Sequence, residues 1–134
     1  MNTEKKRKTL IVDKPLKLDC GKTINNFPVA YETYGELNSK KDNAILVFHA
    51  LTGDQYVTGL NPITKKDGWW SFAVGQNKPI DTNKYFVICT NVIGGCMGSY
   101  GPSDKDPDTG NIFGTNFPVA YETYGELNSK KDNA

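Results

Sequence analysis

Two apolar stretches decide the fold of this chain, AILVFH at Ala44–His49 and YFVIC at Tyr85–Cys89. Each is a continuous apolar run, which is typical of a strand buried on both faces of a parallel sheet. About 35 residues separate the two runs, and parallel strands require a long crossover of this kind, usually helical. The segment GWWSFAV at Gly68–Val74 is the expected helical part. The sequence therefore predicts an α/β domain with a central parallel sheet.

Upstream of these runs, the sequence predicts an antiparallel hairpin. Thr9–Leu18 alternates loosely and contains Pro15, so we expect an edge strand or two short pieces. Cys20–Lys22 is a turn. Phe27–Tyr34 is rich in β-branched and aromatic residues and predicts the second strand. The hairpin then leads into the parallel sheet.

An exact repeat interrupts this pattern. Asn26–Ala44 and Asn116–Ala134 both read NFPVAYETYGELNSKKDNA. Repeat architectures carry many units that have drifted apart, whereas this unit occurs twice without drift, so a solenoid is excluded. A recent duplication, an artificial junction and a sequence-assembly error all explain it. We expect residues 1–115 to be the N-terminal part of an α/β domain and residues 116–134 to be a non-native tail.

The composition excludes several classes of protein. The 134 residues include 16 Lys and Arg against 15 Asp and Glu, a balance that does not favour nucleic acid or an anionic membrane as partner. No apolar run approaches the roughly 20 residues of a membrane helix. Met1–Lys8 is polar and basic, unlike a secretory signal. Three widely spaced cysteines fit free thiols in a reducing compartment, so we expect a cytoplasmic protein.

The end of the first apolar run carries the only histidine, His49, followed by the loop Ala50–Asp54. A catalytic base needs a nucleophile within about 3 Å and an orienting carboxylate, and the sequence places no Ser or Cys to meet His49. We therefore favour a histidine that hydrogen-bonds the backbone at a strand end. The loop either aims backbone N–H groups into the crevice above the sheet or is an ordinary turn.

The segment Gly94–Gly98 reads GGCMG, a cysteine version of the G-x-S-x-G nucleophile elbow. An elbow turns at once into a helix, but Ser99–Asp104 contains Gly and Pro, which do not start one. We therefore expect Cys96 to lie in a structural loop. A cysteine hydrolase that uses Cys96 and His49 stays as an alternative. No set of metal ligands with standard spacing is present, because Cys89 and Cys96 are seven residues apart and Cys20 is remote.

Several short strings together resemble the homoserine O-acetyltransferase family, in the order and spacing of that family from about Leu16 to Pro118. Two small departures are Tyr100, where a small hydroxyl residue is common, and Asp106, where Asn is common. The strings are VAYETYG at Val29–Gly35, FHALTGD at Phe48–Asp54, GWW at Gly68–Trp70, YFVICTN at Tyr85–Asn91, GGCMGSYGPS at Gly94–Ser103 and DPDTG at Asp106–Gly110.

The resemblance implies an α/β-hydrolase fold, here incomplete, and the transfer of an acetyl group from acetyl-CoA to the hydroxyl of L-homoserine in methionine biosynthesis. It implies that Leu51 supplies an oxyanion-hole N–H and that Thr52 and Gly53 shape the pocket wall. It also implies a homodimer and no cofactor besides the acyl-CoA substrate. Relatives that use succinyl-CoA or accept serine are the alternative within the family.

The resemblance also implies that the catalytic triad is missing. The family's nucleophile lies on the elbow after the next parallel strand, and its Asp and His come much later in the chain. No residue of this sequence matches them. The chain by itself is therefore expected to be inactive. A non-catalytic binding or assembly module is the alternative from another class.

Overall fold

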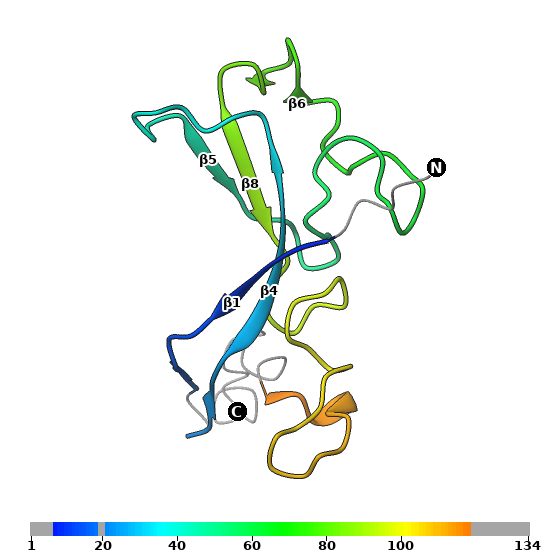
Figure 1. The fold of residues 1–134 in the computed structure, drawn as a ribbon. Helices are drawn as coiled ribbons and strands as arrows, with labels where there is room; N and C mark the ends of the chain where they lie inside the picture. Colours follow the sequence, from blue (N-terminus) through cyan, green and yellow to red (C-terminus); the bar gives the residue numbers. More distant parts are fainter. Residues whose placement is uncertain (1–6, 19–20, 119–134) are drawn as a thin grey trace, which may run out of the picture. The chain divides into compact units, whose positions relative to one another are not determined.

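The structure, a computed structural model, describes residues 7–18 and 21–118, and its main element is a four-stranded sheet (Figure 1). The strands follow in the order β1 (Lys8–Val12), β4 (Phe27–Tyr34), β8 (Phe86–Thr90) and β5 (Ala44–Val47). The smaller elements are β2 (Leu16–Lys17) paired with β3 (Thr23–Ile24), β6 (Val74–Gly75) paired with β7 (Ile80–Asp81), and the 3-10 helix η1 (Gly114–Asn116).

The sheet is mixed. β5 and β8 run parallel, with Val47 opposite Cys89, which confirms the predicted parallel pair. β4 lies on the other side of β8 and is antiparallel to it, with Tyr34 opposite Val87. The predicted strand over Phe27–Tyr34 is confirmed at both ends. For the upstream segment we expected either an edge strand or two short pieces. It forms two short strands, β1 and β2, on either side of Pro15.

The described residues divide into two compact units, residues 7–10 with 30–91, and residues 11–18 and 21–29 with 92–118. Each has its own apolar cluster, because each buries a separate set of aliphatic or aromatic side chains. The first cluster holds Val47, Val57, Val74, Val87 and Cys89. The second holds Ile24, Phe27, Phe113 and Phe117.

The prediction that the strand at Ala44–His49 is buried on both faces is wrong. Val47 is buried, but Leu46 is 52% exposed and Phe48 is 77% exposed. Successive side chains of a strand point to opposite faces, so Val47 faces the cluster while Leu46 and Phe48 lie on the other face. In the described part of the chain, nothing buries these two side chains. The sheet therefore presents one apolar face to solvent.

The predicted helix over Gly68–Val74 is also wrong. The segment makes one turn, in which the Val74 N–H donates to the Trp70 carbonyl at 3.0 Å, and it then enters β6. Its first amides bond elsewhere: the Gly68 N–H donates to Gly59 O at 2.7 Å, and the Trp70 N–H donates to Val57 O at 2.8 Å. Gly68 also packs so closely on the Val57–Thr58 backbone that a Cβ would lie 2.4 Å from it. These long-range contacts outweigh the local helical preference.

Three residues of the second copy lie in the described part. Phe117 is buried in the second cluster, where its ring meets Phe113 edge-on at a centroid distance of 5.1 Å. The other residues of the copy, 119–134, lie outside the described residues, so the non-native origin of the tail stays a prediction. Of the helical segments that the structure describes, none combines the length and apolar character that crossing a membrane requires.

Candidate functional site

The candidate site is the tight turn that follows β5. The Gly53 N–H donates to the Ala50 carbonyl at 2.7 Å and closes the turn. Leu51 and Thr52 lie at its tip and are exposed, and the Leu51 side chain is 68% exposed. Within residues 7–18 and 21–118, no hydrogen bond of the Leu51 N–H is found. The turn therefore presents a free backbone donor at the carboxyl end of a parallel strand.

His49 lies beneath this turn and is 9% exposed. Its Nδ1 lies 2.7 Å from the Ala50 carbonyl oxygen. Its Nε2 lies 3.5 Å from Nδ2 of Asn91, a buried residue that follows β8. The prediction that His49 hydrogen-bonds the backbone at a strand end is confirmed.

The surroundings of Gly53 leave little room for a side chain at this position. A Cβ at this position would lie 3.0 Å from the His49 Cβ and 3.2 Å from the Ala50 carbonyl oxygen. Contacts this short force the neighbouring atoms to move, and one of these neighbours is backbone. Gly53 therefore lets the turn close directly onto the histidine.

Asp54 ties the turn to the loop that follows it. One carboxylate oxygen accepts from the Tyr56 N–H at 2.8 Å, and the other accepts from the Asn61 side-chain amide at 3.0 Å. The Asp54 carbonyl accepts from the Trp69 indole N–H at 2.9 Å. Trp69 in turn stacks on Trp70, with ring centroids 5.7 Å apart. The Trp pair thus supports the loop.

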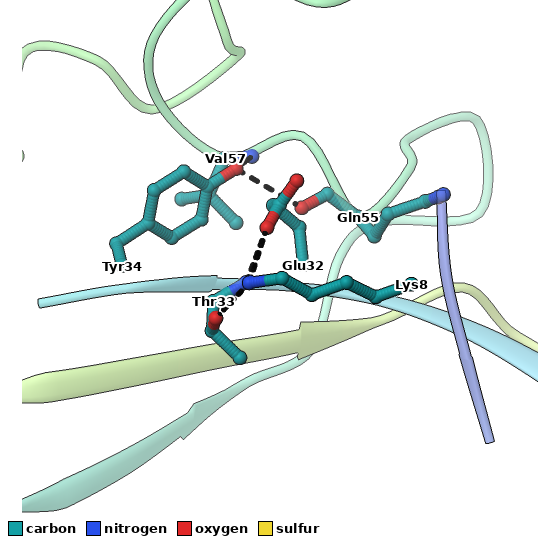
Figure 2. A network of polar contacts seen from close by, with 6 residues as sticks. All are labelled: Lys8, Glu32, Thr33, Tyr34, Gln55 and Val57. Atoms are coloured by element: carbon teal, nitrogen blue, oxygen red, sulfur yellow. Dashed lines mark hydrogen bonds and ion pairs between the residues drawn. The ribbon is translucent and has the colours of Figure 1, made fainter. Parts of the chain in front are cut away.

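The loop after Asp54 rests on a polar network that sequence reasoning missed (Figure 2). The Tyr34 hydroxyl accepts from the Val57 N–H at 3.0 Å and donates to the Gln55 carbonyl at 3.3 Å. Burial, more than any neighbouring charge, raises the pKa of Tyr34 well above its ordinary value. The phenol therefore stays protonated and keeps both hydrogen bonds.

A buried carboxylate lies on the same face of β4. Glu32 Oε1 lies 2.9 Å from the Lys8 ammonium, which also contacts Thr33 Oγ1, and the same Oε1 accepts from the Thr33 N–H at 2.9 Å. The alternation in VAYETYG places Glu32 two residues from Tyr34, which was the available signal that both share a face. Because a buried glutamate is rare, the pattern did not predict its burial.

Cys89 and Cys96 differ in environment. Cys89 is buried under the turn, with Sγ 3.8 Å from the Asp54 carbonyl oxygen. Burial, and then the nearby charge of Asp54, raise its thiol pKa to about 11. Cys96 is exposed in the second unit, and the only helical element described after it is η1 at Gly114–Asn116. The absence of a helix directly after Cys96 is therefore confirmed, and the elbow interpretation fails.

No cluster of three or more metal-ligating side chains occurs among the described residues. The site that the structure brings together consists of Leu51, Thr52 and Gly53 above His49 and Asn91. It presents the exposed backbone of Leu51 and Thr52 above a buried histidine.

No family model matches the chain. A curated relative from Pelagibacter ubique, named homoserine O-acetyltransferase, is 71% identical over 119 residues, which are 89% of this chain and 32% of the relative. This chain is similar to relatives that carry the name homoserine O-acetyltransferase. It spans about a third of the length of the curated relatives that it matches.

Solved structures give the same result for the fold. The homoserine O-acetyltransferase from Bacillus anthracis is 30% identical, with a TM-score of 0.70, and the match covers 94% of this chain and 37% of the other. An esterase is 29% identical, with a TM-score of 0.72, and the match covers 85% of this chain and 33% of the other. These neighbours have the α/β-hydrolase fold, and the mixed sheet of this chain is an incomplete version of it.

Proposed function

We propose that this chain is a segment of a homoserine O-acetyltransferase and that it supplies one wall of the acyl-transfer site. The observation that carries the proposal is the turn after β5, where the Leu51 N–H is free at the carboxyl end of a parallel strand. The identity to relatives of that name gives the substrate class, acetyl-CoA and homoserine. In this role Leu51 donates to the oxyanion of the tetrahedral intermediate, and Thr52 and Gly53 form the adjacent wall.

The chain by itself is proposed to be inactive. Acyl transfer through an acyl-enzyme needs an activated nucleophile, and removing a triad nucleophile costs about 10⁶ in rate. In the described part, His49 binds the Ala50 carbonyl and Asn91. These contacts orient the turn.

The same family resemblance carries two further proposals, a homodimer and a cytoplasmic location. Free thiols at Cys89 and Cys96 support a reducing compartment. Acetyl-CoA is proposed as the donor over succinyl-CoA because the similar relatives are named as acetyltransferases.

A segment exchange tests the proposed function. Residues 16–115 of this chain replace the matching segment of the Pelagibacter ubique enzyme, and the purified chimaera is assayed with acetyl-CoA and homoserine. We expect O-acetylhomoserine from the chimaera and none above buffer from the 134-residue chain alone. A folded chimaera without turnover contradicts the proposal, and turnover by the chain alone contradicts the assignment of the nucleophile to another segment.

The third hypothesis is a cysteine hydrolase that uses Cys96 and His49. No observation favours it, because Cys96 lies in a Gly- and Pro-rich loop with no helix described directly after it. Fast iodoacetamide labelling at neutral pH that is lost in Cys96→Ser is the result that would revive it.

A further inference from the structure

We propose that His49 is a positioning residue that fixes the direction of the Leu51 N–H by holding the carbonyl of the same peptide group. The inference rests on the proposed function, since it assigns a task to that N–H. It gives the only histidine of the chain a role other than that of a general base.

The geometry starts from the peptide between Ala50 and Leu51. Its carbonyl oxygen is engaged twice, by Nδ1 of His49 at 2.7 Å and by the Gly53 N–H at 2.7 Å. The described residues contain no cis peptide bond, and in a trans peptide the C=O and the N–H point in opposite directions. Because the carbonyl is held toward His49 and Gly53, the Leu51 N–H points away from them. Rotating the peptide to aim that N–H elsewhere breaks both hydrogen bonds.

The contacts also determine the tautomer of His49. A carbonyl oxygen only accepts, so Nδ1 must carry the proton. In the neutral ring Nε2 is then an acceptor, and the Asn91 side-chain amide, 3.5 Å away, is a donor that matches it. Both residues are buried, Asn91 to 2% exposure. Asn91 therefore stabilises the tautomer that holds the turn.

Gly53 completes the arrangement from the other side. A Cβ there would lie 3.3 Å from His49 Nδ1 and 3.2 Å from the Ala50 oxygen, so any larger residue would displace the imidazole or the carbonyl. The glycine, the histidine and the peptide are thus one packed unit. The pattern H-A-L-T-G at residues 49–53 contains each part of it.

The first test is NMR on the full 134-residue chain. Since His49 is the only histidine, a long-range proton–nitrogen spectrum reports its tautomer without assignment. We expect the proton on Nδ1. A ring protonated on Nε2 alone overturns the proposal, because Nδ1 then has nothing to donate to the Ala50 carbonyl.

The second test compares His49→Asn with His49→Gln by amide hydrogen exchange. The Asn amide nitrogen occupies nearly the place of Nδ1, whereas the Gln amide reaches nearly the place of Nε2. We expect Gly53 to exchange at close to the wild-type rate in His49→Asn and about tenfold or more faster in His49→Gln, relative to the amides of β8 in the same sample. Equal Gly53 exchange in the two variants overturns the proposal. If His49→Gln does not fold, the tautomer measurement decides alone.

Kinetics of the chimaera separate this inference from the proposed function. With His49→Gln we expect kcat to fall about tenfold or more at nearly unchanged KM, with recovery in His49→Asn. If the parent chimaera is inactive but the NMR results are as expected, the proposed function is contradicted and the positioning role of His49 is not. An active chimaera that does not respond to His49→Gln contradicts only the positioning role.

Discussion

At the scale of the residue, the buried thiol of Cys89 makes a prediction about pH. The unfolded thiol titrates near 9, while burial and the charge of Asp54 raise the pKa of the folded one to about 11. Between pH 9 and pH 11 the Cys89 thiol is deprotonated in the unfolded protein but keeps its proton in the folded one. The contribution of Cys89 to stability is therefore complete below pH 9 and is lost as the pH rises towards 11, by as much as about 1.4 kcal/mol per pH unit.

The measurement is urea unfolding of the wild type, Cys89→Ala and Cys96→Ala at several values between pH 8 and pH 11. We expect the alkaline loss to be smaller in Cys89→Ala and unchanged in Cys96→Ala, since Cys96 is exposed. Parallel pH profiles for the wild type and Cys89→Ala would show that this thiol does not titrate as described.

Part of the candidate site could be predicted from its residues, and part could not. The backbone hydrogen bond of His49 was predictable, because a strand-end histidine without a nearby nucleophile commonly makes one. The contact with Asn91 was not, because Asn91 lies 42 residues further along the chain. The candidate donor Leu51 came from a family resemblance, and nothing in its side chain indicates the role of its N–H.

At the scale of the element, an ion pair joins β1 to β4, which are also hydrogen-bonded neighbours in the sheet. Lys8 lies 2.9 Å from Glu32, whose side chain is only 6% exposed. We expect Lys8→Met to destabilise the protein by about 1–3 kcal/mol, because it removes a cation from a buried carboxylate. The Lys8 side chain is 37% exposed, so solvent screening keeps the loss towards the lower end.

Urea unfolding of four proteins checks this prediction. Lys14→Met, which changes an exposed lysine of the same segment, serves as the control and is expected to be neutral. The double variant Lys8→Met with Glu32→Met is expected to recover part of the loss. Equal midpoints for Lys8→Met and Lys14→Met would mean that the pair contributes nothing.

The elements also show which patterns were reliable. The β-branched and aromatic residues of Phe27–Tyr34 predicted β4, and two continuous apolar runs predicted β5 and β8, because such residues suit the surface of a sheet. The connection at Gly68–Val74 was predicted as a helix and is a single turn, because its amides bond to Val57 and Gly59, which no local pattern shows. We predicted that both faces of β5 are buried, whereas Leu46 and Phe48 are exposed. An apolar run does not show on how many faces of a strand the rest of the chain packs.

At the scale of the whole molecule, the open face of the sheet predicts self-association. Leu46 and Phe48 are exposed on it, and β5 is an edge strand among the strands described. Exposed apolar patches and unpaired strand edges promote association. We expect Leu46→Thr with Phe48→Ser to reduce concentration-dependent association in light scattering without lowering the urea midpoint.

The control for this prediction lies on the other face of the same strand. Val47 is buried, so Val47→Thr should lower the urea midpoint, corresponding to about 1–2 kcal/mol, and leave association no weaker. If the double variant associates as strongly as the wild type, a different surface is responsible.

The central claim is that the Leu51 N–H of this chain stabilises the oxyanion of acyl transfer. It is tested most directly by replacing Leu51 in the chimaera with its α-hydroxy acid analogue, which exchanges the backbone N–H for an oxygen and keeps the side chain. The matched control carries the same replacement at Thr52. The account predicts that kcat with acetyl-CoA and homoserine falls about 10²–10³-fold for position 51 and stays close to that of the parent chimaera for position 52. Equal rates at the two positions would contradict it.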